Sequence, residues 1–494
     1  MLTRRAFVAA TAIAGAGIPG GISFGQDRRE ATPLPIPQLI DPRANDGKLS
    51  LSIGPGTHAY LPGRPVRSFG YSAPVLGPAI RLRRGDTTQI SLENKMAAAT
   101  TVHWHGVLIP GAADGGPHNV IAPGQTSTVS LAIDQPETTA WFHPHPHSKT
   151  APQVYSGLAG LLLIEDSSSE RLGLPRHYGI DDLPLILQDR VFGDDGSPIY
   201  APGPMGVMAG YRGNSFIVNG VVAPVARVPA GLVRLRLLNG ANARFFEIQF
   251  SDTRTFHVVG SDGGYLPAPV PLRRLLIAPG ERYEIVVDFS KGGKTTLATG
   301  PDRNLPMMGM MMGGALPADG GMLLTFEVDA SLPVAANTLP KALVPVPPID
   351  RMKVARIRQF LLNDMMMGGG MMMGGGMMMG GRGGGPVMAI NGRPFDMGRI
   401  DLNVKKGTVE LWRIGAQMMG HPFHVHGTQF QLLSMNGQQP PPHMRGWKDT
   451  VIVAREAEIL VPFSQPASAE TAFMFHCHIL EHEDAGMMGQ YTCT

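Results

Sequence analysis

The sequence predicts an all-β protein made of three related domains. Residues 79–83, 233–237 and 283–287 are apolar or alternating runs bounded by glycine and proline, whereas long amphipathic helices are hard to find. Strands separated by turns at short intervals are typical of antiparallel sandwiches or barrels. A chain of 494 residues is long enough for three domains, at roughly 100–200 residues each.

A strand–glycine–strand phrase supports this plan because it occurs three times, around Gly85, Gly231 and Gly407. Each glycine is expected to occupy a tight turn. The spacing of the three copies and the composition of the stretches between them divide the chain into segments. The predicted segments are domains at 45–168, 178–330 and 356–494, a linker at 331–355, and a Met/Gly-rich insertion at 364–385 in the third domain.

The composition excludes several classes of protein. With 43% hydrophobic residues, 16% charged residues and a net charge of +3, the chain has the balance of an ordinary soluble protein and no sign of a nucleic-acid partner. Two cysteines are too few for a disulfide scaffold or a multi-cysteine zinc module. We expect a monomer. The unusual feature is a count of 29 methionines.

The N-terminus has the form of an export signal. Arg4 and Arg5 precede a modest apolar run at residues 8–18, which is the pattern of a twin-arginine signal. We therefore predict a signal and the start of the mature chain within residues 1–31, and a periplasmic location. A frayed basic N-terminus is the alternative. No other apolar stretch reaches about 18 residues, so no membrane span is expected in the mature protein.

Four His-x-His pairs predict a metal centre. Residues i and i+2 of a strand point to the same face, so both imidazoles of a pair can reach one polynuclear site. Imidazole suits copper, zinc, iron or nickel, and the pairs alone therefore leave the metal open. Two pairs lie at matching distances after Gly85 and Gly407, where the middle copy has only Ile248 and Gln249. The pairs are His103/His105, His143/His145, His424/His426 and His476/His478.

One cysteine lies between two histidines near the C-terminus. His482 follows Cys477 by five residues and Met487 follows it by ten, while His421 precedes the histidine pair of the third domain. A thiolate, two imidazoles and a weak axial thioether are the ligands of a mononuclear His₂Cys copper site. A disulfide between Cys477 and Cys493, which export would permit, is the alternative.

These motifs resemble those of the three-domain multicopper oxidases, and among them the bacterial copper efflux (cuprous) oxidases and related laccases. The resemblance covers the chain from about residue 45 to the end, apart from the insertion. It implies three cupredoxin-like Greek-key β-sandwich domains and four copper ions, three of them between the first and third domains. The matching segments are His103-Trp104-His105-Gly106, Trp141-Phe142-His143-Pro144-His145, His421-Pro422-Phe423-His424-Val425-His426-Gly427 and His476-Cys477-His478 through Met487.

The resemblance also implies a role for each candidate ligand. The type 1 copper would be bound by His421, Cys477, His482 and axial Met487. The type 2 copper would be bound by His103 and His424, and the type 3 pair by His105, His143, His145, His426, His476 and His478. Cys477 would then bind the copper that accepts electrons, while its covalent neighbours bind the cluster that reduces one O₂ to two waters.

Two acidic residues occupy positions where the family has acids that serve the cluster. The resemblance implies that Asp114, in Asp114-Gly115-Gly116, and Glu483, beside His482, supply protons for water formation. The alternatives are a turn aspartate for Asp114 and a solvated acid for Glu483.

The methionines indicate a second role for copper. Thioethers are soft ligands that favour Cu(I), so the Met/Gly-rich insertion and a second methionine cluster at residues 307–312 are interpreted as copper-gathering segments. An inert low-complexity spacer is the alternative. The resemblance implies that Asp364 and Met419 bind a substrate Cu(I). Gln417 and Gln359 depart from the aspartate and the methionine expected in that site.

The sequence therefore predicts an exported oxidase that couples the one-electron oxidation of Cu(I), and of phenols or aromatic amines, to the reduction of O₂ to water. Its expected role is copper tolerance, and its expected partners are O₂, Cu(I) and small phenolic reductants. A general laccase without a copper role is one alternative. A non-enzymatic copper-binding scaffold with the same fold is the other.

Overall fold

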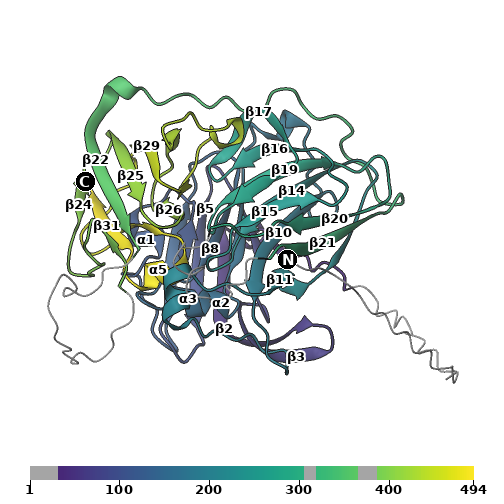
Figure 1. Cartoon of the computed structure of the whole chain (residues 1–494), viewed down its shortest axis with the longest axis horizontal. Helices are drawn as coiled ribbons and strands as arrows, with labels where there is room; N and C mark the ends of the chain where they lie inside the picture. Colours follow the sequence, from purple (N-terminus) through teal and green to yellow (C-terminus); the bar gives the residue numbers. More distant parts are fainter. Residues whose placement is uncertain (1–31, 305–318, 365–386) are drawn as a thin grey trace, which may run out of the picture. The chain divides into compact units, whose positions relative to one another are not determined.

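The strands form three pairs of packed sheets, so the prediction of an all-β chain with three cupredoxin-like sandwiches is confirmed (Figure 1). The computed structural model describes residues 32–304, 319–364 and 387–494. The predicted export signal, both methionine clusters and nearly all of the insertion at 364–385 lie outside these residues. In the described part of the chain, no helix has the length and hydrophobicity that crossing a membrane requires.

The first sandwich carries the first two histidine pairs. One of its sheets has the order β1-β4-β9-β8-β6 and the other the order β3-β2-β5-β7. Ile80 and Phe142 of the first sheet pack against Leu51 and Ile90 of the second, and this buried core holds the sheets together. The strands are β1 (Leu39–Ile40), β2 (Lys48–Leu61), β3 (Arg64–Tyr71), β4 (Ala79–Arg83), β5 (Thr87–Asn94), β6 (His103–His105), β7 (Thr126–Ala132), β8 (Thr138–His143) and β9 (Gly160–Glu165).

The second sandwich pairs a sheet of order β12-β11-β10-β14-β19-β16-β17 with one of order β13-β21-β20-β15-β18. Its core packs Leu185 and Val233 against Phe246 and Phe326. The strands are β10 (Asp182–Arg190), β11 (Ser215–Val218), β12 (Val221–Val222), β13 (Val225–Val228), β14 (Leu232–Asn239), β15 (Phe246–Phe250), β16 (Phe256–Ser261), β17 (Gly264–Leu272), β18 (Leu275–Ile277), β19 (Arg282–Asp288), β20 (Lys294–Thr299) and β21 (Gly321–Val328).

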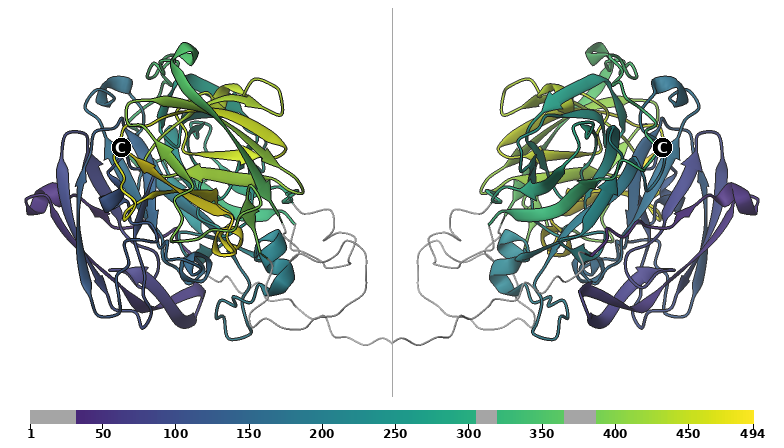
Figure 2. Two further views of the ribbon diagram at one scale, coloured as in Figure 1. Left: turned by 90° about the vertical axis from the view of Figure 1, so that its left-hand side faces the viewer. Right: turned by 90° about the vertical axis from the view of Figure 1, so that its right-hand side faces the viewer.

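The third sandwich pairs sheets of order β23-β22-β25-β29-β27 and β24-β31-β30-β26-β28. Figure 2 shows its green and yellow strands beside the purple and blue strands of the first sandwich. Its core includes Trp412, Cys477 and Met487. The strands are β22 (Val354–Asn363), β23 (Ala389–Ile390), β24 (Leu402–Val404), β25 (Val409–Ala416), β26 (His421–Val425), β27 (Gln431–Met435), β28 (Thr450–Val453), β29 (Glu456–Pro462), β30 (Phe473–Cys477) and β31 (Met488–Cys493).

Helices contribute little to the described part of the chain, but α3 and α5 pack against each other, as do α2 and α5. The α-helices are α1 (Gly111–Asp114), α2 (Thr150–Tyr155), α3 (Gly203–Ala209) and α5 (Leu480–Asp484). The 3₁₀ helices are η1 (Pro42–Asn45), η2 (Glu170–Leu172), η3 (Arg351–Lys353) and η4 (Pro442–Met444).

The internal repeat corresponds to one shared topological step. In each domain the strand–glycine–strand phrase leaves one sheet and enters the other, as β4 to β5, β13 to β14 and β24 to β25. Gly85 and Gly407 have φ values of +90° and +81°, the left-handed conformation that favours glycine. Gly231 differs from the expectation, because it has no positive φ; a Cβ there would instead collide with Val334.

The same step explains where the histidine strands lie. β6, β15 and β26 follow the phrase in their respective domains, and β15 has Ile248 and Gln249 in place of histidines. In the first domain, β8 pairs with β6 so that His143 lies opposite His103. In the third domain, β30 pairs with β26 so that His476 lies opposite His424. Each outer domain therefore presents two histidine pairs on adjacent strands.

A buried ionic network joins the middle and third domains near these strands. The fully buried Lys448 Nζ lies 2.8 Å from Asp262 and 3.0 Å from Glu281, both also fully buried. Burial alone would lower the pKa of Lys448, but the two carboxylates outweigh it and raise that pKa well above its ordinary value. Lys448 is therefore charged and compensates two acids that have no access to water.

We predict that Lys448→Ala destabilises the protein strongly. The substitution leaves Glu281 as a buried acid without its ion-pair partner and Asp262 with only Arg282, 3.6 Å away, and breaking a buried pair in this way costs about 3–5 kcal/mol. Denaturant unfolding of the two proteins measures the difference. Lys294→Ala, which removes an exposed partner of Glu327, is the control and should change stability little. Equal effects of the two substitutions would contradict the assignment.

Candidate metal centre

Three donor atoms from separate elements converge in the core of the third sandwich. Cys477 lies at the end of β30, His421 begins β26 and His482 lies in α5. The Cys477 Sγ atom lies 3.3 Å from His421 Nδ1 and 3.7 Å from His482 Nδ1, and the two Nδ1 atoms are 3.3 Å apart. All three side chains are fully buried. We call these residues, together with Met487, the mononuclear set.

The spacing of these atoms suits one trigonal metal ion. Bonds of about 2.0–2.3 Å from imidazole nitrogen and thiolate sulfur to a first-row metal place trigonal donors about 3.5–3.8 Å apart. The observed triangle is close to this size. A buried thiolate with two imidazoles is the donor set of a His₂Cys copper site.

Met487 reaches the same place through backbone hydrogen bonds. The Cys477 amide donates to the Met487 carbonyl at 3.1 Å, and the Met487 amide donates to the His482 carbonyl at 2.9 Å. The Met487 side chain is fully buried in the core that contains Cys477. The loop after α5 therefore returns the thioether to the neighbourhood of the thiol.

The outer nitrogens of both imidazoles also have partners. Asp364 Oδ1 lies 2.6 Å from His421 Nε2, and His482 Nε2 lies 3.1 Å from the carbonyl oxygen of Met208 in α3. Such contacts orient a ligand histidine and select the nitrogen that faces the metal. Burial would raise the pKa of Asp364, but its contact with His421 lowers that pKa below its usual range.

Asp364 and Met419, the residues expected to bind substrate Cu(I), are both buried in the described chain, and their binding of Cu(I) stays a prediction. The Asp364 carboxylate contacts His421 and accepts the Met418 amide, and the Met419 side chain is buried in the core of the third sandwich. Gln359 and Gln417 are exposed. Asp364 therefore acts as a partner of the mononuclear set.

Eight imidazoles form a second cluster, the histidine cluster, where the first and third domains meet. None is more than 1% exposed. They form overlapping groups in which one donor atom of each residue lies within 4.8 Å of the others. The all-histidine groups are His103/His105/His424, His105/His143/His478 and His145/His426/His476, and the last two contain only residues from the set expected for the type 3 pair.

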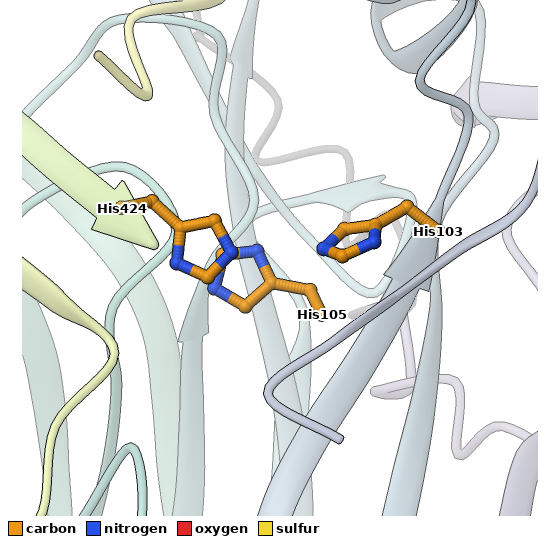
Figure 3. Close-up of side chains that lie close together, drawn as sticks. All are labelled: His103, His105 and His424. Atoms are coloured by element: carbon orange, nitrogen blue, oxygen red, sulfur yellow. The ribbon is translucent and has the colours of Figure 1, made fainter. Parts of the chain in front are cut away.

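Ring stacking relates the two halves of the cluster. His103 stacks on His426 and His105 stacks on His424, each with ring centroids 3.7 Å apart. Figure 3 shows His105 of the first domain lying nearly parallel to His424 of the third, with His103 beside them. Both of these stacks pair one ring from each outer domain, so the cluster exists only when the two domains are packed together.

One nitrogen of a ring is typically held by protein while the other faces the cluster. Nδ1 of His103, His143 and His424 bonds to a backbone carbonyl at 2.9 Å. Among the described residues, the Nε2 atoms of these three rings are buried without a hydrogen-bond partner. A buried ligand atom without a partner is what a metal ion would satisfy.

The third group of the cluster gives the same indication. The Nε2 atom of His476 lies 3.1 Å from that of His426 and 3.3 Å from that of His145. A ring nitrogen carries at most one proton, so three that converge on one point are better satisfied by one cation than by one another. The donor chemistry of the cluster therefore fits copper, as does that of the mononuclear set.

Both acids proposed from the sequence touch the histidine cluster. Asp114 Oδ2 lies 2.8 Å from His426 Nδ1, and the Asp114 carbonyl accepts the bond from His103. Glu483 Oε2 lies 3.2 Å from His476 Nδ1, and Glu483 Oε1 lies 3.5 Å from His145 Nδ1. Burial raises the pKa of Glu483 well above its ordinary value, which favours a protonated acid.

Asp449 makes the reciprocal contacts and was not predicted. Its carbonyl accepts a bond from His424 of its own domain, and its carboxylate lies 3.1 Å from His105 Nε2 of the first domain. Asp114 holds His103 and His426 in the same way from the other side. Asp449 follows its domain's histidine pair at a different distance from that of Asp114, so the repeat carries no signal that could have identified it.

Burial also determines the protonation of the donors. Removal from water lowers the pKa of His424, and it lowers the pKa well below the ordinary value for His105, His143, His145, His426, His476 and His478. Burial lowers the pKa of His482 to about 3 and raises that of the Cys477 thiol. Neutral imidazole is the ligand form, and a metal cation would supply the charge that a buried thiolate needs.

The two donor sets are joined by covalent bonds. His476 and His478 belong to the histidine cluster and flank Cys477 of the mononuclear set. Alternation along β30 turns His476 and Cys477 to opposite faces, so neighbouring residues reach different sites. The arrangement suits a protein that takes up electrons at one centre and uses them at another.

Sequence and structure comparisons agree on the family. Profiles described as Multicopper oxidase match residues 53–169, 204–296 and 368–494. Curated relatives named Cell division protein FtsP, from Xenorhabdus nematophila and Escherichia coli K12, are 36% and 35% identical over 99% of this chain and 98% of theirs. A solved laccase-like multi-copper oxidase CueO from Ochrobactrum sp. is 42% identical, with a TM-score of 0.84, over 94% of this chain and 100% of its own.

These relatives correct the predicted function. The expectation of a cuprous oxidase or laccase in copper tolerance is wrong, because the curated relatives that match along nearly the whole chain are named for cell division. Ligand motifs specify the chemistry of a metal core, but they do not specify its reductant or its biological role. With all three profiles matched in order, the chain belongs to the multicopper oxidase family.

Proposed function

We propose that this protein works in cell division as a copper-loaded oxidase that reduces O₂. The observation that carries the oxidase part is the convergence of two buried donor sets joined through His476, Cys477 and His478. The cell-division part is supported by the curated relatives, which cover 99% of the chain. We further propose four copper ions, one in the mononuclear set and three in the histidine cluster.

When bound, copper would supply one-electron redox chemistry at the mononuclear set and the four-electron reduction of O₂ to water at the histidine cluster. The chain provides the environment. Asp364 and the Met208 carbonyl orient the two imidazoles of the mononuclear set. Asp114 and Asp449 each hold two histidine rings, one from the first domain and one from the third. The buried side chains of both sets exclude water from the donor atoms.

Water formation consumes protons, and Glu483 is in a position to hold one. Its carboxyl group is buried within 3.5 Å of two cluster imidazoles, and burial favours its protonated form. Asp114 has one carboxylate oxygen against His426, while its other oxygen is buried without a hydrogen-bond partner among the described residues. We propose that Glu483 and Asp114 relay protons to the cluster.

We also propose that the protein is exported to the periplasm. The twin arginines Arg4 and Arg5, followed by a modest apolar run, support this location. An exported, folded copper protein is compatible with a role in dividing the cell envelope.

Copper loading tests the metal assignment. We expect the wild-type protein to bind four copper ions per chain and to be intensely blue, whereas Cys477→Ser should lose the blue band because the thiolate is gone. Cys493→Ser is the matched control, since Cys493 is an equally buried free cysteine outside both donor sets. Visible absorption and metal analysis decide the matter. A colourless wild-type protein with bound copper would contradict the mononuclear site.

Oxygen reduction can be tested without assigning a reductant. Anaerobically reduced protein, mixed with buffer of known O₂ content, should consume one O₂ for every four electrons stored. Glu483→Gln should slow this reoxidation by about 100-fold or more, the usual contribution of a positioned proton donor. Glu410→Gln, a buried acid on β25 bonded to Arg358, should leave the rate unchanged. An unchanged rate in Glu483→Gln would exclude the relay.

The link to cell division is tested in cells that lack the gene. We expect such cells to divide late and grow long, and the wild-type gene to restore their length. The Cys477→Ser gene should fail to restore it while giving the same amount of exported protein. Full restoration by Cys477→Ser would show that division does not need the mononuclear set, and normal length without the gene would refute the cell-division role.

A further inference from the structure

The three domains meet at one buried side chain, Arg282. It begins β19 in the middle domain, the domain that contributes no ligand to either donor set, and its side chain is 1% exposed. Arg282 contacts Thr139 of the first domain, Gly280 and Asp262 of its own domain, and Asp449 of the third.

All five guanidinium N–H groups of Arg282 have an acceptor. Nε donates to the Thr139 carbonyl at 3.1 Å, and one hydrogen of each Nη donates to a carbonyl, Gly280 or Asp262, at 3.0 Å. The remaining two hydrogens bind both oxygens of Asp449, at 2.7 and 2.6 Å. This fork-shaped contact determines the position and the plane of the Asp449 carboxylate.

The position of Asp449 determines which nitrogen of His105 is free. The carboxylate can only accept a hydrogen bond, so His105 Nε2, which lies 3.1 Å from it, carries the ring proton. His105 Nδ1 is then the unprotonated nitrogen, and among the described residues it is buried without a hydrogen-bond partner. The Asp449 carbonyl meanwhile holds His424, on which His105 stacks. Arg282 thus acts on two rings that it does not touch.

The packing around this contact leaves no room for adjustment. Gly106, which follows His105, has a φ of +88°, and a Cβ at this position would collide with Arg282 Nη2 and Asp449 Oδ2. The backbone at Gly106, directly after His105, therefore packs against the Arg282–Asp449 pair. A displacement of this pair would also displace His105.

We propose that Arg282 is a positioning residue of the histidine cluster, through which the middle domain sets the tautomer and orientation of His105 by way of Asp449. The proposal rests on the proposed copper function of the cluster. It gives the middle domain a role in a centre whose ligands all come from the outer domains.

Arg282→Lys tests the proposal because lysine keeps the charge but cannot make the planar two-point contact. We expect the blue band of the mononuclear set to keep its intensity, whereas the copper affinity of the histidine cluster should fall by about 10- to 100-fold, as for other changes to partners of ligand histidines. Competition with a copper chelator, followed by electron paramagnetic resonance, measures both centres in one sample.

The control is Arg236→Lys. Arg236 is also a buried middle-domain arginine that contacts Thr139, but its carboxylate partners, Asp182 and Glu284, do not touch a cluster histidine. It should lower thermal stability without changing the resonance signal of the cluster. Equal losses of cluster copper in both variants would reduce Arg282 to a general packing role and overturn the proposal.

Metal-free crystals separate this proposal from the copper function. In Arg282→Lys without metal, His105 should turn away from Asp449, while the wild-type contact is retained. If the His105 ring keeps its place, the proposal is wrong even when copper binds. If the wild type binds no copper, the copper function fails, but these crystals still decide the role of Arg282. Should Arg282→Lys not fold, Asp449→Ala, which removes the acceptor for His105 Nε2 but keeps the backbone carbonyl that holds His424, is expected to release His105, and an unmoved ring there would equally overturn the proposal.

Discussion

The structure depends on the contacts through which the first and third domains bind each other's histidines at the histidine cluster. Asp114 binds one histidine of each domain, and Asp449 does the same from the opposite side. Each contact fixes one nitrogen of a histidine ring and leaves the other nitrogen of that ring facing the neighbouring histidines. Burying such nitrogens without partners is unfavourable, by about 1–3 kcal/mol each, unless a cation satisfies them. The interface is therefore shaped around a metal site.

This constraint explains why the middle domain keeps the same fold without histidines. Its strand β15 occupies the position of β6 and β26 but carries Ile248 and Gln249 there. The domain instead places charged groups at the junction, where Lys448 of the third domain meets Asp262 and Glu281. Charges buried so deeply require partners in defined positions, and the network therefore fixes how the middle and third domains pack.

Much of the metal centre could be predicted because the sequence patterns that indicate it are local. The period of two along a strand puts His103 and His105 on one face, and the repeat of Gly85 and Gly407 relates two histidine strands. Gly231 shows the limit of this reasoning: its place in the phrase is shared, but its constraint comes from the contact with Val334, far along the chain. The biological role was also beyond these motifs, because ligands do not identify a reductant or a partner.

The sequence by itself determined the fold class, since apolar and alternating runs between turns specify strands. Strand spacing and the resemblance together predicted three related domains and the candidate donor residues. Only the tertiary structure revealed Asp449 and Arg282. The His105–Asp449 contact spans 344 residues of chain and the Arg282–Asp449 contact spans 167, so no local pattern encodes them. The tertiary structure likewise revealed the contact between Asp364 and His421. The pairing of β22 with β25 and the loop that leads into β26 bring these two residues together. Local motifs indicate the candidate donor residues, but the choice of ring nitrogen depends on partners that only the packed domains bring together.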